Sequence, residues 1–177
     1  LVMHGGDKYL ELGKPNNGGT KLFSVSGHVE RPGNYIVPLG TPLRFLLDWV
    51  GARSAASEII LGGPMMGVAQ STLSVPVVKG TSGITVIASG SIKPEGYEPC
   101  IKCASCVEAC PMGLMPYKLG DYGKVFRTGE FKEWDGLACI ECGCCSYVCP
   151  AKRPLLQWIR LGKLKMRQEA QKAAAAK

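Results

Sequence analysis

The stretch "CIECGCCSYVCP", Cys139 to Pro150, decides how the second half of this chain folds, because it contains five cysteines. An earlier stretch, "CIKCASCVEACP" from Cys100 to Pro111, has the same spacing. Both read C-x2-C-x2-C-x3-C-P once Cys144 is aligned with Ser105. The repeat makes Cys144 the extra cysteine. We expect it to be a small side chain in a tight loop, with a redox-sensing thiol as the alternative.

Each motif has the spacing that holds four-iron, four-sulfur clusters. Three cysteines at x2 intervals wrap one face of a cubane, and in two-motif proteins the fourth cysteine reaches the other cluster. Cluster 1 is therefore predicted on Cys100, Cys103, Cys106 and Cys149, and cluster 2 on Cys139, Cys142, Cys145 and Cys110. Pro111 and Pro150 follow the crossing cysteines and turn the chain away. Gly143 is expected to relieve crowding where backbone amides approach cluster sulfurs.

Two other uses of the nine cysteines are less compatible with this spacing. Structural zinc sites also use C-x2-C pairs, but their second pair normally follows after a longer gap. A disulfide framework does not suit an odd count in which eight cysteines lie only two or three residues apart. Thiols used as metal ligands indicate a reducing, cytosolic compartment.

The composition is that of a globular protein of one domain or two small ones. The chain has 177 residues, 46% of them hydrophobic and 20% charged. No apolar run of about 18 residues is present, so neither a membrane-spanning helix nor a signal peptide is expected. The formal net charge of +7 is consistent with nucleic-acid binding. Two clusters with their thiolates would add about −4, so we expect no nucleic-acid partner.

The first half has the patterns of a small α+β domain. Residues 21–29 alternate between apolar and polar side chains, which predicts a half-buried strand. A turn and a second strand at 35–40 complete a hairpin. The segment 41–51 predicts a helix, with Thr41 as N-cap, Pro42 as first helical residue and Gly51 as its end. Further strands are expected within 58–63 and 83–90.

These patterns give a domain plan for the chain. Residues 1–20 are expected to be a linker or the frayed edge of a removed domain, since they are rich in glycine, asparagine and polar groups and Leu1 begins close to the first strand. The α+β domain spans 21–92, and the linker 93–99 follows. A helical domain holding both cysteine motifs spans 100–170, and 171–177 is an Ala-rich tail.

The last helix is expected to begin at Pro154. Its apolar stripe is predicted to contain Leu155, Trp158, Ile159 and Met166, with Arg160, Lys163 and Arg167 off the stripe. These basic residues either meet anionic lipid or an acidic partner subunit, or form a solvated face.

No catalytic residues are predicted. The sequence contains no Ser-His-Asp set, no paired acids and no Walker-type loop, and His4 and His28 lie far from the cysteines. His28 is expected on the surface of a strand. The loop "GGPMMG", Gly62 to Gly67, either approaches a partner or cofactor closely or is a tight loop whose methionines fill core gaps; we favour the second interpretation. Four cysteines for each cluster leave no open iron, which favours electron transfer.

The second half resembles the ferredoxin region of the C subunit of the Rnf electron-transport complex. The resemblance rests on "CIKCASCVEACPMGLMP", "CIECGCCSYVCPAKRPLLQWIRLGK" and the upstream "GGPMMG". The first half resembles the soluble-ligand-binding β-grasp (SLBB) domain of the same subunit. Its stretch "GTKLFSVSGHVERPGNYIVPLGTPLRFLL" also looks like the equivalent domain in the flavoprotein subunit of NADH dehydrogenase.

The resemblance implies an electron-transfer subunit of an oxidoreductase and translocase, peripheral on the cytoplasmic face of a cell membrane. In that family an N-terminal flavin domain exchanges electrons with NADH, and two 4Fe-4S clusters relay them to or from a ferredoxin-like iron–sulfur subunit. The complex couples this flow to Na+ or H+ transport. FMN and NAD(H) are expected only on the missing N-terminal part, because no glycine-rich dinucleotide loop followed by an acidic residue is found here.

Three alternatives stay open at the level of sequence. The SLBB half is expected to serve packing and docking, although a bound ligand is the other reading of that domain. The cobalamin reductase of bacterial microcompartments has the same domain order and would be a soluble relay. A different class of protein, a zinc-stabilised basic module that binds nucleic acid, would be colourless and sensitive to salt.

Overall fold

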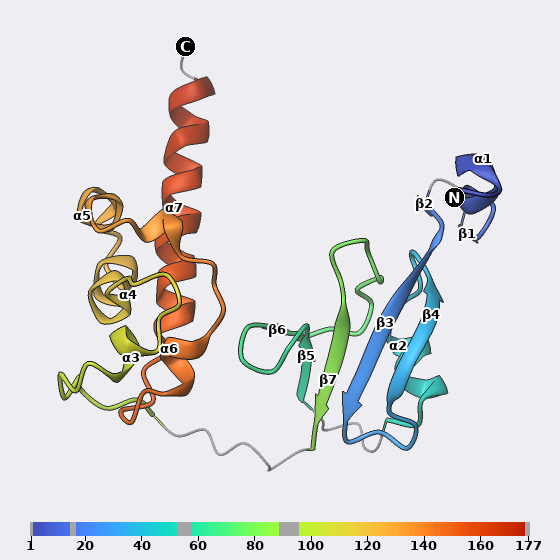
Figure 1. The fold of residues 1–177 in the computed structure, drawn as a ribbon, viewed down its shortest axis with the longest axis horizontal. Helices are drawn as coiled ribbons and strands as arrows, with labels where there is room; N and C mark the ends of the chain where they lie inside the picture. The colour runs from blue at the N-terminus through green and yellow to red at the C-terminus, as the bar shows by residue number, and fades with distance from the viewer. Residues whose placement is uncertain (1, 15–16, 53–57, 89–95, 176–177) are drawn as a thin grey trace. The chain divides into compact units, whose positions relative to one another are not determined.

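The computed structural model describes residues 2–14, 17–52, 58–88 and 96–175. The chain divides into two compact units, Leu1–Pro94 and Glu95–Lys177, which are described separately below. Positions 93–95 of the predicted linker and the last two residues of the predicted tail lie outside the described residues. Figure 1 shows all the described strands in the first unit, together with two short helices, whereas the second unit contains helices, as the sequence patterns predicted.

The first unit is built on a five-stranded sheet of order β4-β3-β7-β5-β6. Its strands are β3 (Thr20–Gly27), β4 (Gly33–Pro38), β5 (Glu58–Leu61), β6 (Val68–Ala69) and β7 (Gly83–Ile87). β3 and β4 form the predicted antiparallel hairpin, and β7 lies parallel to β3. β6 was not predicted, because two residues are too few to show an alternating pattern.

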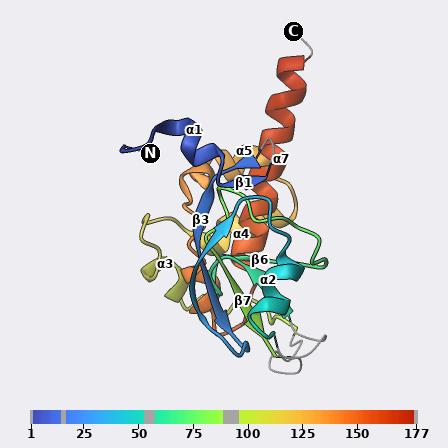
Figure 2. The ribbon, with the colours of Figure 1, turned by 90° about the vertical axis from the view of Figure 1, so that its right-hand side faces the viewer.

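Helix α2 (Leu43–Trp49) covers one face of this sheet, and the core lies between them (Figure 2). Phe23 and Val25 point to this face, since alternate residues of a strand share a side. Leu43 and Leu46 of α2 pack against them, as a helical period of 3.6 requires. The alternating pattern read at 21–29 is therefore confirmed as the buried side of β3.

The start of α2 differs from the prediction by one residue. Pro42 and not Thr41 is the capping residue, and no side chain caps the helix. The Thr41 hydroxyl instead donates a hydrogen bond to the carbonyl of Pro38 at 2.7 Å. Carbonyls of residues 73 and 75 accept the first two N–H groups of α2, at 3.1 and 3.0 Å, so no side-chain cap is needed. Gly51, with φ +68°, follows the helix end as predicted.

The described part of residues 1–20 is more ordered than the predicted linker. It contains α1 (Gly5–Leu10) and the short antiparallel pair β1 (Gly13–Lys14) and β2 (Asn17–Gly18). The hydroxyl of Tyr9 donates a 2.5 Å hydrogen bond to the carbonyl of Thr20, which ties α1 to the start of β3. This long-range contact gives no local signal in a stretch rich in glycine and asparagine.

The second unit is helical, as predicted. Its elements are α3 (Ser105–Glu108), α4 (Pro116–Lys124), α5 (Thr128–Glu133), the short 3-10 turn η1 (Gly136–Ala138), α6 (Cys144–Tyr147) and α7 (Leu155–Ala175). α7 continues into the residues predicted as a tail, as far as Ala175, and extends past the other helices of its unit (Figures 1 and 2). Alanine is the best helix former, which explains the extension. None of the helices in the described ranges has the length and apolar character needed to cross a bilayer.

α4 and α7 are the corresponding helices of the two repeats, because each begins six residues after the last cysteine of its motif. They pack closely through glycines. A Cβ atom added at Gly123 would lie 2.2 Å from the backbone oxygen of Trp158, and one at Gly162 would lie 2.8 Å from the ring of Phe131. Phe131, Leu119 and Ile159 form the buried centre of this contact.

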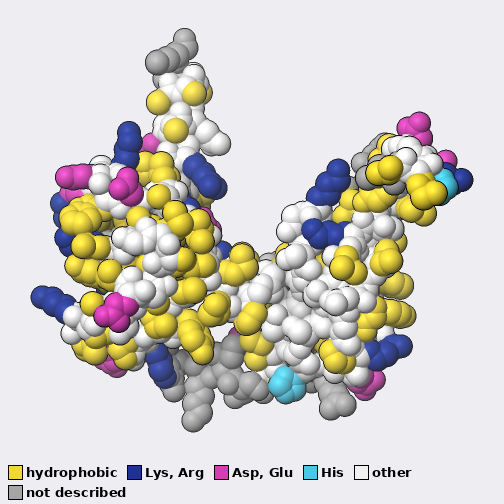
Figure 3. Space-filling view, viewed as in Figure 1, with side chains coloured by type: hydrophobic (Ala, Val, Ile, Leu, Met, Phe, Trp, Pro, Cys, Tyr) yellow, Lys and Arg dark blue, Asp and Glu magenta, His cyan; other side chains and the backbone are white. Residues whose placement is uncertain are grey.

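Hydrophobic side chains also remain on the surface of the helical unit, as the face in Figure 3 shows. Val125, Phe126 and Leu164 are each at least half exposed. An apolar fraction of this kind is normal for a protein surface, so these residues on their own do not mark a site.

The close approach of α4 and α7 generates a stability prediction. Gly123→Ala should lower the free energy of unfolding by about 1–3 kcal/mol, because the added methyl group meets backbone atoms that cannot move aside easily. Urea unfolding followed by far-UV circular dichroism measures the change.

Gly129→Ala in α5 is the matched control. Nothing lies within 4 Å of a Cβ atom added there. The substitution should leave stability unchanged or raise it by roughly 0.4–1 kcal/mol, because alanine restricts the unfolded chain. Equal effects of the two substitutions would contradict the packing described for Gly123.

Candidate metal centre

The eight cysteines of the repeated motifs line two cavities in the helical unit, four around each. The first cavity has a volume of about 350 Å³, and its cysteines are Cys100, Cys103, Cys106 and Cys149. The second is tighter, about 20 Å³, and its cysteines are Cys110, Cys139, Cys142 and Cys145. These groups coincide with the two sets predicted from spacing. In each, three cysteines come from one loop and the fourth from the other.

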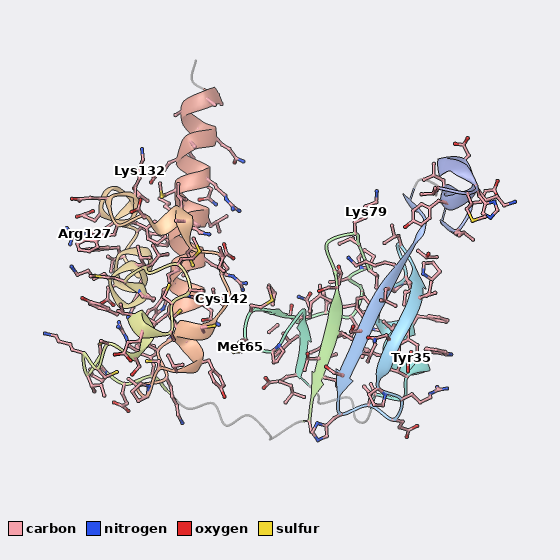
Figure 4. The ribbon with its side chains drawn as sticks, in the orientation of Figure 1. Tyr35, Met65, Lys79, Arg127, Lys132 and Cys142 are labelled. Atoms are coloured by element: carbon pink, nitrogen blue, oxygen red, sulfur yellow. The ribbon has the colours of Figure 1, made fainter. Side chains whose placement is uncertain are left out.

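The packing of the short helices explains how the sets cross. α3 and α6 carry the third cysteine of each motif, Cys106 and Cys145, and the two helices are in contact. Both cysteines are buried and belong to one apolar cluster with Leu155 and Trp158 of α7. Cys142 lies on the loop before α6, beside α7 (Figure 4). The chain leaving each short helix thus reaches the neighbouring cavity.

Both cysteine loops share an unusual backbone. Lys102 and Glu141 occupy matching positions and have φ values of +57° and +60°. Ala104 and Gly143 form a second matched pair, with φ values of +63° and +85°. Left-handed residues that alternate with ordinary ones turn successive N–H groups toward one side, which makes a concave site for anionic groups. Gly143 adopts this left-handed conformation, and Ala104 shows that a residue other than glycine can adopt it at the matching position. The relief of crowding expected at Gly143 stays a prediction.

Cysteine sulfurs in both loops accept hydrogen bonds from neighbouring residues. The Ser105 hydroxyl donates to Sγ of Cys103 at 3.4 Å, and the backbone N–H of Glu141 donates to Sγ of Cys139 at 3.4 Å. The Ser105 hydroxyl is the main reason why the pKa of the exposed Cys103 thiol is lowered. Donors of this kind stabilise a thiolate, which is the form that binds a metal.

The deeper thiols lie in the opposite environment. Burial, together with the neighbouring Cys139, raises the pKa of Cys145 to about 11. Burial also raises the pKa of Cys106 and of Cys139. A bound metal ion deprotonates a coordinating thiol outright, so we expect the buried Cys106 and Cys145 and the half-buried Cys139 to become thiolates together with a bound cation.

Cys144 is the first residue of α6, at the position that Ser105 occupies in α3. It is absent from the walls of both cavities. The pKa of the Cys144 thiol is raised, chiefly by a hydrogen bond with Cys142. A raised pKa favours the protonated, less nucleophilic form, which counts against the redox-sensing alternative.

Sequence reasoning missed a buried cation at the first cavity. Arg153 lines this cavity and is 8% exposed. One of its terminal nitrogens forms an ion pair with Asp121, while the other, Nη1, is buried and has no hydrogen-bond partner among the described residues. The only signal was its place directly before Pro154, three residues after the second C-P pair.

Lys163 was predicted to lie off the apolar stripe of α7, among the basic residues of the other face. This prediction is wrong, because Lys163 is buried. It is 7% exposed. Its ammonium donates to the carbonyl of Cys139 at 2.5 Å and to the carboxylate of Glu141 at 2.9 Å. Arg160 pairs with the same carboxylate at 2.9 Å. Burial alone would raise the pKa of Glu141, but the two basic partners outweigh it and lower that pKa.

The remaining candidates lie in the first unit. His4 and His28 are both exposed. His28 was expected on the surface of a strand, but it follows directly after the last residue of β3, Gly27. Met65 and Met66 of the "GGPMMG" loop are each 44% exposed, so the expectation that they fill core gaps is wrong; Figure 4 labels Met65 on this loop. The loop is tight at Gly67, where an added Cβ would lie 2.4 Å from the side chain of Ile60.

The two cavities fit an iron–sulfur cluster by their donor chemistry. Each offers four soft sulfur ligands, and the loops turn N–H groups toward anionic groups. The unpaired Nη1 of Arg153 supplies a further donor at the first cavity. A zinc ion binds sulfur at about 2.3 Å, so the first cavity is larger than one ion needs. The second cavity requires its walls to move apart to take a group of the same size.

Family comparisons agree with this reading of the two units. A model of the SLBB domain matches residues 22–69, and a model of the 4Fe-4S dicluster domain matches residues 99–153. The predicted α+β fold class, an SLBB domain followed by a ferredoxin-like domain, is therefore confirmed. The dicluster match also confirms the prediction of two 4Fe-4S clusters.

Curated relatives match most of this chain but only part of their own length. The C subunit of a proton-translocating ferredoxin:NAD(+) oxidoreductase complex of Clostridium ljungdahlii is 41% identical over 88% of this chain and 35% of the relative. The C subunit of an ion-translocating oxidoreductase complex of Methanosarcina acetivorans is 37% identical over 86% and 34%. The corresponding protein of Klebsiella pneumoniae is 40% identical over 89% and 22%.

The chain thus spans at most 35% of the length of these relatives. Among solved structures, the air-oxidized form of an NAD+-reducing NiFe hydrogenase is 18% identical, with a TM-score of 0.42, over 77% of this chain and 24% of that chain.

The two adjacent cysteines give a direct test of the predicted ligand sets. Cys144→Ser should retain both clusters, with about eight irons per chain, because the hydroxyl replaces a thiol that lines neither cavity. Cys145→Ser should lose about four irons, because it removes a ligand at the second cavity. Iron and acid-labile sulfide analysis after anaerobic purification measures both. Loss of a cluster in Cys144→Ser would show that the alignment of the two motifs is wrong.

Proposed function

Because this chain is homologous over most of its length to part of the C subunit of ion-translocating oxidoreductase complexes, we propose that it relays single electrons within such a complex. The observation that carries the proposal is the gathering of four cysteines at each of two cavities in one small helical unit. Electron transfer needs no general acid, base or nucleophile, which agrees with the lack of a predicted catalytic residue.

The proposed ligands are the two sets predicted from spacing. Cluster 1 is assigned to Cys100, Cys103, Cys106 and Cys149, and cluster 2 to Cys139, Cys142, Cys145 and Cys110. The lining of the two cavities supports this assignment. Bound clusters supply one-electron redox chemistry at potentials set by net charge, hydrogen bonds to sulfur and solvent exposure.

The protein's own residues control the surroundings of the two sites. Tyr117 and Leu155 line the first cavity, and Leu119, Leu156 and Ile159 line the second. These apolar walls lower the local dielectric constant and so strengthen the effect of nearby charges. Cys103 is exposed at the first cavity. We therefore propose the surface around Cys103 as the place where an electron passes to or from a partner.

The partner and location are proposed from the relatives. Their names describe subunits of complexes that translocate ions, and one name includes ferredoxin and NAD(+). For this protein we propose a ferredoxin-like iron–sulfur subunit as electron partner and a peripheral position on the cytoplasmic face of the membrane. FMN and NAD(H) are proposed for a part of the full-length subunit that this chain does not span. The SLBB unit is proposed to serve packing and docking.

Anaerobic purification tests the electron-transfer proposal. The protein should be brown and contain about eight irons and eight acid-labile sulfides per chain, because two four-iron clusters are expected. Dithionite should bleach the visible absorption in one-electron steps. Colourless protein with stoichiometric zinc would contradict the proposal and favour a zinc-stabilised module.

Co-purification separates a membrane complex from a soluble relay. An affinity-tagged full-length subunit, purified from detergent-solubilised membranes, should retain integral membrane subunits and an iron–sulfur partner. Recovery of the subunit only from the soluble fraction would contradict the proposed location.

A further inference from the structure

Arg153 is a charged side chain at the wall of the first cavity that the relay described above does not use. Its side chain is 9% exposed, and the Trp158 ring lies 4.9 Å from its guanidinium carbon. Burial of a charge is costly unless the charge is paired and hydrogen-bonded. Asp121 pairs with one nitrogen, but the buried Nη1 has no partner in the described ranges. Because Arg153 lines the first cavity, a group bound in that cavity is the acceptor that we expect for the buried Nη1.

Cys100 of the same cavity lies beside this guanidinium. Burial alone would lower the pKa of Arg153, but hydrogen bonds with Asp121 and Cys100 and the charges of both groups raise it. The arrangement brings a permanent positive charge next to a predicted ligand of cluster 1. The Cys100 sulfur is thus an acceptor beside the guanidinium that carries the unpaired Nη1.

We propose that Arg153 is a positioning residue for cluster 1: its Nη1 donates a hydrogen bond to a sulfur of that cluster, and its charge raises the reduction potential of the cluster. This inference rests on the proposed function. The sign follows from charge. An oxidised four-iron core with four thiolates carries roughly −2, and a one-electron reduction makes it more negative. A nearby buried cation therefore favours the reduced form.

Asp121 opposes this effect and provides a test of opposite sign. Its side chain is 53% exposed, so water screens its charge more than that of the buried Arg153. The pair of charges together should therefore raise the reduction potential of cluster 1. Removal of the Asp121 carboxylate charge should therefore raise the reduction potential of cluster 1 further. If Arg153 only filled space, neutralising Asp121 and removing Arg153 would not shift this potential in opposite directions.

Lys163 offers a matched control, because it is the other buried cation among the described residues of the unit. Its ammonium already donates to the Cys139 carbonyl and to Glu141. It lies beside a ligand of cluster 2 and lines neither cavity. Lys163→Met should therefore leave the potential of cluster 1 unchanged.

The experiment is a redox titration of the full-length protein, purified anaerobically and followed by electron paramagnetic resonance, with iron content measured for each variant. Arg153→Met should lower the reduced-to-oxidised ratio of one cluster at fixed potential by roughly tenfold, which is about 59 mV for one electron. Arg153→Lys should lower the same potential by less, because it keeps the charge and loses the planar donor. Asp121→Asn should raise it.

Retention of about eight irons in Arg153→Met with both potentials unchanged would overturn the inference. So would a lower potential in Asp121→Asn, or a shift of the same cluster in Lys163→Met. If Arg153→Met loses iron, the opposite shifts of Arg153→Lys and Asp121→Asn decide the question. A wild-type protein without iron would overturn the proposed function as well, so the two failures are distinguishable.

Discussion

The fourth cysteine around each cavity comes from the opposite loop, and the rest of the helical unit follows from this exchange. Neither loop can complete a set of four thiols alone, so α3 and α6 must lie in contact. The helices that continue from them, α4 and α7, are then forced close together. Gly123 and Gly162 permit that approach, since larger side chains would meet backbone or ring atoms. The core of Leu119, Phe131 and Ile159 closes around the same contact.

The duplication extends beyond the cysteines into the backbone. Left-handed residues recur at the same distance from their motifs in both halves, as the pairs Lys102/Glu141, Ala104/Gly143 and Gly113/Lys152 show. In each pair at least one partner is not glycine, so the conformation persists without the residue that most readily adopts it. Strain of this kind is retained where the surroundings determine the conformation. Here the surroundings are two loops that turn their N–H groups toward a shared pair of sites.

Features set by spacing or local pattern could be predicted from the sequence, whereas features set by tertiary contacts could not. The cysteine intervals predicted the residues around each cavity, and the alternation in β3 predicted its buried face. Thr41 was mistaken for a helix cap because the carbonyls that satisfy α2 come from a distant segment, at residues 73 and 75. The sequence pattern placed Lys163 on the solvated face of its helix, but hydrogen bonds to Glu141 and to the Cys139 carbonyl keep its ammonium group buried. Arg153 shows no pattern at all, since its role depends on Asp121 and on a cavity formed by two distant loops.

Ser105 and Cys144 occupy matching positions in the two motifs, and their different side chains make the duplicated sites chemically unequal. In α3 a hydroxyl donates to the sulfur two residues earlier, and in α6 a thiol stands at the same position. A thiol is the weaker donor. The two sites also differ in cavity volume and in the buried Arg153, which lines only the first cavity. The exchange of one atom, oxygen for sulfur, adds a difference in hydrogen bonding to a cysteine sulfur, while the matched left-handed backbone is kept.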